Sequence, residues 1–369
     1  MSNDKLKIAY LFGSLNRGGT ETLFLDVFRN ASMASFKFIG IHRKDGTYRD
    51  EFYAAGPKMV RLAPKRFGYV RYILQLRRLL KSENITIVHA QHWLDGIYAW
   101  LATIGTGIRV INTFHGYFSM KGLNGFLCRM SIRMADEMCF VSRYEQEWYQ
   151  RQMKIADSKC HVIFNGVDFS KIDNAGKMTD EKFESGNLKL CMVGNFVEVR
   201  DHVTLVKALT KVKSDFDFYF IGKRSEDYFY IYDECVRICE GNGMKNVHFL
   251  GGRGDVPALL KQMDGFVYST DHDTFGIAIV EAMAAGLPIV VNDYAVMKEV
   301  CGESDENYVR YYHSKDVDGC AEAIQQLLKD LSFSSAEFKQ RCAHNSIYVR
   351  ERYSIESYID RLSHIYSEH

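Results

Sequence analysis

Short apolar runs alternate with amphipathic segments along the first half of the chain. Leu6 to Phe12 is a mostly apolar run, which is typical of a strand buried on both faces of a parallel sheet. Thr20 to Asn30 and Tyr69 to Lys81 place their apolar residues at helical spacing instead. Further strands are predicted at residues 36–42, 85–91, 109–115, 137–142 and 160–166. This repeated order of strand and helix predicts a parallel, doubly wound sheet.

The same alternation starts again after a polar segment at residues 168–187. The pattern predicts strands at residues 188–194, 216–222, 246–252, 265–270 and 287–293. It predicts helices at residues 203–212, 227–241 and 277–285, and a helical end at 334–369. Two successive α/β units are therefore expected, and ligands bind such sheets at the carboxyl ends of the strands.

Length and composition favour a two-domain protein without a membrane span. The 369 residues exceed the usual size of one domain. The nine cysteines are scattered and form no paired metal-binding motif, which predicts reduced thiols in a cytoplasmic protein. The apolar runs are too short for a signal-peptide core or a transmembrane helix.

The net charge of +1 hides a division between the two halves of the chain. Residues 1–170 carry a balance of +10 and residues 171–369 a balance of −9. Either the first half meets an anionic partner, or the division is surface charge without a role. The basic segments 63–82 and 118–135 fit an anionic membrane surface. They fit equally well amphipathic helices that pack on their own domain.

Residues 269–293 contain the most informative pattern in the chain. A strand leads to Asp271 and Asp273, a turn follows, and a helix begins near Ile277 and carries Glu281 one turn later. Free N–H groups at the start of a helix can bind a diphosphate. Carboxylates beside it suit the hydroxyl groups of a ribose and a sugar, so the pattern predicts a site for a nucleotide sugar.

This stretch resembles the Glu-x7-Glu signature of glycosyltransferase family 4, with Asp273 in place of the first Glu. The resemblance implies that Asp273 contacts the donor sugar and Glu281 the ribose. It also implies that Phe275, Gly276 and Ile277 border the donor. The triplet Asp271-His272-Asp273 also imitates an Asp-x-Asp metal motif. The flanking residues match family 4 rather than the fold that carries that motif, so no metal ligand is predicted.

Other segments extend the resemblance over nearly the whole chain. In residues 191–209, Arg200 aligns with the family's lysine that contacts the donor diphosphate, and Asn195 stands where an arginine is frequent. Gly18 and Gly19 resemble the glycine loop that borders the donor's phosphates. His115, in Thr-Phe-His-Gly, resembles a histidine beside the donor sugar. Arg253 either stacks on the base or is merely exposed.

The resemblance implies a GT-B fold, with two Rossmann-like domains facing across a cleft. Residues 1–170 are expected to bind the acceptor and residues 171–345 the donor. Residues 346–369 are expected to form a helix that packs back on the N-terminal domain. His115, Asp273 and Arg200 are the predicted catalytic residues.

The activity that the resemblance implies is that of a retaining, metal-independent hexosyltransferase. Its donor would be a UDP- or GDP-sugar, with no other cofactor and no nucleic acid. Its acceptor would be a saccharide or lipid-linked saccharide of bacterial surface-polysaccharide biosynthesis. The enzyme is expected in the cytoplasm, peripherally on the inner face of the membrane. Three alternatives are a nucleotide-sugar epimerase, a non-catalytic scaffold and an NAD-dependent dehydrogenase, whose Gly-x-Gly-x-x-Gly fingerprint the chain lacks.

Overall fold

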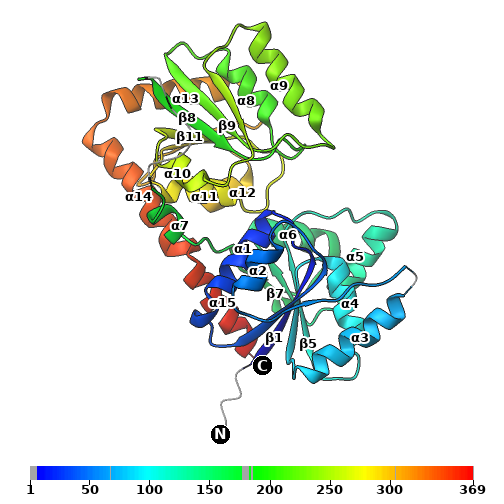
Figure 1. The fold of residues 1–369 in the computed structure, drawn as a ribbon. Coiled ribbons are helices and arrows are strands. Elements are labelled where there is room, and N and C mark those ends of the chain that lie inside the picture. The colour runs from blue at the N-terminus through cyan, green and yellow to red at the C-terminus, as the bar shows by residue number, and fades with distance from the viewer. Residues whose placement is uncertain (1–5, 67, 177–182, 184–185, 304, 369) are drawn as a thin grey trace. The chain divides into compact units, whose positions relative to one another are not determined.

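Two parallel sheets organise the chain, each in its own unit of a computed structural model (Figure 1). The N-terminal unit comprises residues 1–167 and 355–369, and the C-terminal unit residues 168–354. The structure describes residues 6–66, 68–176, 183, 186–303 and 305–368. The two-domain α/β architecture predicted from the sequence is confirmed.

The N-terminal unit is a seven-stranded sheet in the order β3-β2-β1-β4-β5-β6-β7, with every pair parallel. Its strands are β1 (Lys7–Ser14), β2 (Lys37–Lys44), β3 (Met59–Arg61), β4 (Ile87–Ala90), β5 (Arg109–Phe114), β6 (Glu137–Phe140) and β7 (Cys160–Val162). Its helices are α1 (Gly19–Arg29), α2 (Arg49–Ala54), α3 (Tyr69–Ser82), α4 (Trp93–Thr103), α5 (Gly122–Met134), α6 (Arg143–Met153) and α15 (Ile355–Ser367).

The C-terminal unit is a six-stranded parallel sheet in the order β10-β9-β8-β11-β12-β13. Its strands are β8 (Leu188–Val193), β9 (Phe216–Ile221), β10 (Val247–Gly251), β11 (Gly265–Tyr268), β12 (Ile289–Asn292) and β13 (Val309–Tyr312). Its helices are α7 (Ser170–Asp173), α8 (His202–Leu209), α9 (Phe229–Gly241), α10 (Val256–Leu260), α11 (Ile277–Ala284), α12 (Ala295–Cys301), α13 (Val317–Phe333) and α14 (Ala336–Tyr353).

The final helix returns to the N-terminal unit, as predicted (Figure 1). Ile359 and Leu362 of α15 share a buried cluster with Phe24 and Phe28 of α1. Within this cluster the Tyr366 hydroxyl lies 3.0 Å from that of Tyr10. Burial of this apolar stripe stabilises the unit by roughly 25 cal/mol for each Å² removed from water.

The start of this returning segment was predicted too early. The boundary lies at Ser354/Ile355 rather than at 345/346, because α14 runs unbroken to Tyr353 and belongs to the C-terminal unit. The buried Asn345 accepts a hydrogen bond from the Tyr308 N–H (2.9 Å) and donates one to the Leu287 carbonyl (2.8 Å). Ser354 then adopts an extended conformation, which divides the predicted helical end into two helices. The first boundary lies at 167/168, close to the predicted 170/171.

Two strands were not predicted, and both lie at the edge of a sheet. β3 has only three residues and β13 four, and most of their residues are half-buried. Short edge strands lack the long apolar run by which buried strands are recognised. All nine cysteines are free thiols, as predicted, and eight are buried. None of the described helices has both the length and the apolar character needed to cross a membrane.

Candidate functional site

The order of strands reverses direction next to β8 in the C-terminal unit. The chain builds β8, β9 and β10 outward on one side, then returns to β8 to place β11, β12 and β13 on the other. Loops diverge from the carboxyl ends of the strands at such a switch point and leave room for a ligand. The loop after β8 contains Asn195 and Arg200, and the loop after β11 contains Asp271, Asp273 and Gly276. The structure therefore brings together most of the residues predicted in this unit.

Backbone hydrogen bonds join these two loops. Arg200 and Thr270 form an isolated antiparallel bridge. The Asp201 N–H donates to the Ser269 carbonyl (3.1 Å), and the Asp271 N–H donates to the Val199 carbonyl (3.0 Å). The position of Arg200 relative to the turn after β11 is therefore set by main-chain contacts.

The Arg200 side chain lies over the turn after β11. Nη1 donates to the Thr270 hydroxyl (3.1 Å), and Nη2 lies 3.1 Å from Asp273 Oδ2. The guanidinium carbon stands 5.3 Å from the centre of the Tyr268 ring. Burial lowers the pKa of Arg200, but Asp273 and Tyr268 together outweigh burial and leave the pKa raised. Arg200 is thus a fixed cation with 20% of its side chain exposed.

Asp273 is held by its own turn and is only 8% exposed. Oδ1 accepts the Thr274 N–H (2.9 Å), and Oδ2 accepts the Tyr268 hydroxyl (2.8 Å). Burial raises the pKa of Tyr268 well above its ordinary value, so the phenol remains a donor. The Asp273 carboxylate therefore lies between the backbone of the turn and the Arg200 guanidinium.

Helix α11 begins directly after this turn. Gly276 adopts a φ of +87°, a conformation that L side chains rarely adopt. Gly276 is the N-cap residue of α11 and supplies no side-chain cap, and the N–H groups at such a helix start can bind an anion. Glu281 is half-buried in the second turn of the helix. The Phe275 side chain is 1% exposed and packs edge-on against Tyr353, so Phe275 can border a ligand only through its backbone.

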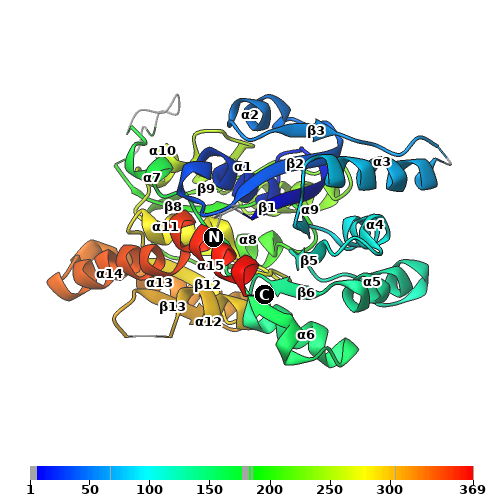
Figure 2. The same ribbon diagram turned by 90° about the horizontal axis from the view of Figure 1, so that it is seen from below.

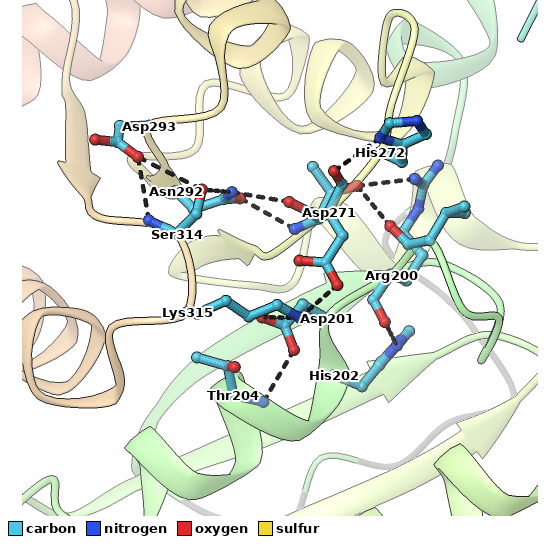
Figure 3. A network of polar contacts seen from close by, with 12 residues as sticks. Arg200, Asp201, His202, Thr204, Asp271, His272, Asn292, Asp293, Ser314 and Lys315 are labelled. Carbon is cyan, nitrogen blue, oxygen red and sulfur yellow. Dashed lines mark hydrogen bonds and ion pairs between the residues drawn. The ribbon is translucent and has the colours of Figure 1, made fainter. Parts of the chain in front are cut away.

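A second cation, which no sequence motif indicated, reaches the same loops from the segment after β13 (Figure 3). Lys315 Nζ lies 3.2 Å from Asp201 Oδ2 and also forms an ion pair with Asp271. From β12, Asn292 accepts the Thr270 N–H (3.0 Å) and donates to its carbonyl (2.8 Å). Lys315 is remote from the motif in sequence, and β13 was not predicted, so no local pattern marked it.

The two carboxylates of the Asp271-His272-Asp273 triplet form ion pairs with different cations. Asp271 pairs with Lys315, whereas Asp273 pairs with Arg200. Among the described residues, no group of three or more His, Cys, Asp or Glu side chains could hold a metal ion.

Two other predicted donor residues bind neighbours in the same unit. The Asn195 carboxamide oxygen accepts the Lys223 N–H (2.9 Å), which ties the loop after β8 to the loop after β9. The Arg253 guanidinium binds both oxygens of Asp255, at 2.8 and 2.7 Å. This contact fixes the plane of Arg253 at the carboxyl end of β10.

The remaining predicted residues lie in the N-terminal unit, where a cavity of about 520 Å³ opens at the carboxyl ends of β1, β2, β4 and β5. His115 lines this cavity, and its Nε2 lies 2.9 Å from Gln91 Oε1. Burial, with a smaller contribution from His92, lowers the pKa of His115 to about 3. His115 is therefore a neutral hydrogen-bonding group near pH 7.

The predicted glycine loop lies at one border of this cavity. Gly18 precedes α1, and Gly19 is the first residue of that helix. A Cβ atom at Gly18 would lie 2.7 Å from Glu21 Oε2, so glycine makes room for this carboxylate. Burial raises the pKa of Glu21, which also lines the cavity.

Two family models match the chain, one in each unit. Residues 17–171 match Glycosyltransferase Family 4, and residues 187–330 match Glycosyl transferases group 1. Together the two matches cover every strand of both sheets except β1.

Curated relatives share between a fifth and a third of the aligned residues. N-acetyl-alpha-D-glucosaminyl L-malate synthase of Bacillus anthracis is 27% identical over 286 residues, which are 72% of each chain. UDP-Gal:alpha-D-GlcNAc-diphosphoundecaprenol alpha-1,3-galactosyltransferase of Escherichia coli is 25% identical over 244 residues, covering 61% of this chain and 62% of that protein. Among solved structures, Anabaena HepE in complex with UDP is 16% identical and has a TM-score of 0.87 over 99% of this chain and 100% of that one.

Proposed function

We propose that this chain, which belongs to the family 4-like glycosyltransferases of the GT-B fold, moves a hexose from a nucleotide-diphosphate sugar to a hydroxyl group of a lipid-linked saccharide. The observation that carries the proposal is the place of Arg200. A fixed cation lies at the switch point of the C-terminal sheet, in the loop beside the open start of α11.

This arrangement suits the chemistry of sugar transfer. When the bond between the sugar and the diphosphate breaks, negative charge develops on the departing phosphate. A guanidinium group and free backbone N–H groups that are already in position stabilise such charge without reorganisation. We assign this role to Arg200 and the first turn of α11, and we assign the hydroxyl groups of ribose and sugar to Glu281 and Asp273.

The proposed reaction retains the anomeric configuration and requires no metal ion. The acceptor hydroxyl attacks the anomeric carbon on the face from which the diphosphate leaves. The proton passes to the departing phosphate oxygen, so no side-chain base is needed. The pairing of Asp271 with Lys315 and of Asp273 with Arg200 supports a cation-based site, because both carboxylates already have cationic partners.

The names of the relatives suggest the substrates to test first. The Escherichia coli relative is named for UDP-galactose and a diphosphoundecaprenol acceptor, and the HepE structure holds UDP. We therefore propose a UDP-sugar as donor, with a GDP-sugar as the second choice. We also propose an acceptor that carries a lipid diphosphate, as in bacterial surface-polysaccharide assembly.

A thermal-shift screen tests the donor proposal. UDP, GDP, ADP and CMP, followed by the corresponding sugars, are added with and without EDTA. A ligand at 100 times its Kd adds about 2.7 kcal/mol to the stability of the state that binds it. We expect one nucleoside diphosphate to raise Tm equally with and without EDTA. No shift with any nucleotide contradicts the proposal, and a shift that EDTA abolishes contradicts its metal-independent part.

We further propose that the N-terminal unit works at an anionic membrane surface on the cytoplasmic side. Helices α3, α4 and α5 lie side by side along this unit (Figure 2). Val70 of α3 and Leu123 of α5 are each 73% exposed, and Leu74 and Phe126 are half-exposed on the same helices. Exposed cations accompany them on both helices, including Arg71, Arg78 and Arg133. Apolar side chains beside cations are what binding to anionic lipid requires.

Vesicle co-sedimentation tests this membrane contact. Val70→Glu and Leu123→Glu should each reduce binding to vesicles of anionic phospholipid. Wild-type protein should not bind zwitterionic vesicles. Ile347→Glu is the matched control, because Ile347 is 51% exposed on α14 of the other unit. Equal binding by all variants would contradict the assignment of this surface.

A further inference from the structure

Five Lys and Arg side chains lie in the loops after the carboxyl ends of the strands in the C-terminal unit. Four of them pair with carboxylates: Arg200 with Asp273, Arg224 with Asp233, Arg253 with Asp255, and Lys315 with Asp201 and Asp271. The fifth is Lys223, which follows β9. Lys223 is exposed, and among the described residues its ammonium group forms no ion pair. Its charge is therefore available to an anionic ligand.

The backbone of Lys223 is fixed on both sides. Its N–H donates to the Asn195 carboxamide oxygen, and its carbonyl accepts the Phe196 N–H, each at 2.9 Å. At the preceding position, a Cβ atom on Gly222 would lie 1.9 Å from the Gly194 carbonyl oxygen. The loops after β8 and β9 thus pack backbone to backbone. The family resemblance places a cation at position 195. Asn195 instead binds the backbone of Lys223, which has a positively charged side chain.

The Lys223 side chain lies across a glycine in the next loop. A Cβ atom on Gly252 would come within 2.4 Å of Lys223 Cγ and 2.8 Å of its Cε. The absence of a side chain at position 252 therefore lets the stem of Lys223 lie flat at the carboxyl ends of β9 and β10. Both strands lie on the side of β8 opposite to β11.

The charges on the two sides of the switch point differ. On the side of β12 and β13, Asp201, Asp271 and Asp293 line the loops beside Lys315 (Figure 3). On the side of β9 and β10, Asp233 and Asp255 are paired with Arg224 and Arg253, so among the described residues the ammonium of Lys223 keeps its charge without an ion pair. A nucleotide whose diphosphate begins at Arg200 is therefore favoured to extend toward β9, where its second phosphate gains a cation.

We propose that Lys223 is a second phosphate-binding cation of the donor site and supplies the charge that position 195 lacks. This inference rests on the proposed function, because it concerns the same nucleotide. In this proposal three residues act together. Asn195 holds the backbone of Lys223, Lys223 binds the anion, and Gly252 leaves room for the aliphatic part of the Lys223 side chain.

Calorimetry with UDP and GDP tests the proposal, with uridine and guanosine measured by ligand-observed NMR as uncharged counterparts. Lys223→Gln should raise the Kd of the diphosphate about tenfold, and Lys223→Arg should restore most of the affinity. Neither variant should change the Kd of the nucleoside. Lys245→Gln is the matched control, because Lys245 is exposed before the amino end of β10.

Gly252→Ala provides an independent variant, since the added methyl displaces the lysine stem. It should weaken diphosphate binding in the wild type and have no further effect in the Lys223→Gln background. If wild-type protein binds neither diphosphate, the proposed function fails and this inference fails with it. If wild type binds and Lys223→Gln binds equally well, only this inference is overturned. Equal weakening of nucleoside and diphosphate would also overturn it, because the contact would then not be with phosphate.

Discussion

Arg200 Nη2 and Asp273 Oδ2 lie 3.1 Å apart, although the two residues were predicted to bind different parts of the donor. Arg200 was assigned to the diphosphate and Asp273 to the sugar. Their contact means that an arriving phosphate competes with the carboxylate for the same guanidinium group. Because Asp273 also binds the Tyr268 hydroxyl and the Thr274 N–H, it keeps partners when Arg200 turns toward a ligand. We therefore expect the donor phosphate to replace Asp273 as the partner of Arg200. The buried Asp273 carboxylate then keeps its two hydrogen bonds.

Removal of the Arg200 charge should abolish most turnover. Arg200→Gln is expected to lower kcat/KM at least about 100-fold, the effect typical of losing one preorganised group that stabilises developing charge. Arg200→Lys should retain part of the activity. Arg224→Gln is the control, because Arg224 binds Asp233 through two contacts of 2.9 Å after the neighbouring strand. A folded Arg200→Gln enzyme with wild-type kinetics would remove Arg200 from the site.

Glu281 offers a separate test of the donor site. Glu281→Ala should abolish detectable transfer while circular dichroism and Tm stay close to wild type, because this half-buried residue lies in the second turn of α11 rather than in the core. The measurement is release of nucleoside diphosphate at several donor concentrations. Unchanged rates in a folded variant would show that Glu281 does not touch the donor.

The glycine before α11 should be sensitive to the smallest substitution. Gly276→Ala forces an L residue to a φ of +87° and places Cβ 3.2 Å from Met297 Cε. We expect a loss of about 1–2 kcal/mol in stability, together with weaker donor binding as the turn shifts. Gly254→Ala is the control, because a Cβ atom there meets no atom within 4 Å. Chemical denaturation should separate the two variants, and equal stability would contradict the assigned strain.

Two histidines of the N-terminal unit should make stability depend on pH. Burial lowers the pKa of His89 and of His115 to about 3, whereas an unfolded histidine titrates near 6.5. Between these values the unfolded chain binds more protons than the native one. Stability is therefore fully present above about pH 6.5 and falls as the pH drops toward 3, by up to about 1.4 kcal/mol per pH unit for each histidine.

Denaturation of the wild type and of His115→Gln between pH 7.5 and 5 checks this dependence. The variant should show a shallower loss of stability than the wild type, because one titrating group has been removed. A wild-type slope of zero would contradict the buried, neutral state of both histidines.

The long apolar runs and helical periodicities of this chain determined by themselves that it forms two parallel α/β units. A buried strand such as β1 is recognised by its apolar run, and an amphipathic helix such as α3 by the helical spacing of its apolar residues. Both signals lie within the segment itself, so they can be read without knowing which other segments pack beside it. Short local motifs likewise identified the turn at Asp273 and the start of α11. The edge strands β3 and β13 have no such signal, because half-buried short strands lack a continuous apolar run.

Only the tertiary structure decided which distant residues meet. Lys315 approaches Asp271 because β13 lies beside β12, and Lys223 lies over Gly252 because β9 lies beside β10. α14 belongs to the C-terminal unit because Asn345 finds buried backbone partners there, in Tyr308 and Leu287. These relationships arise from strand order and from hydrogen bonds between segments remote in sequence. A local pattern cannot encode them, because the physical partner of each group is far away in the chain.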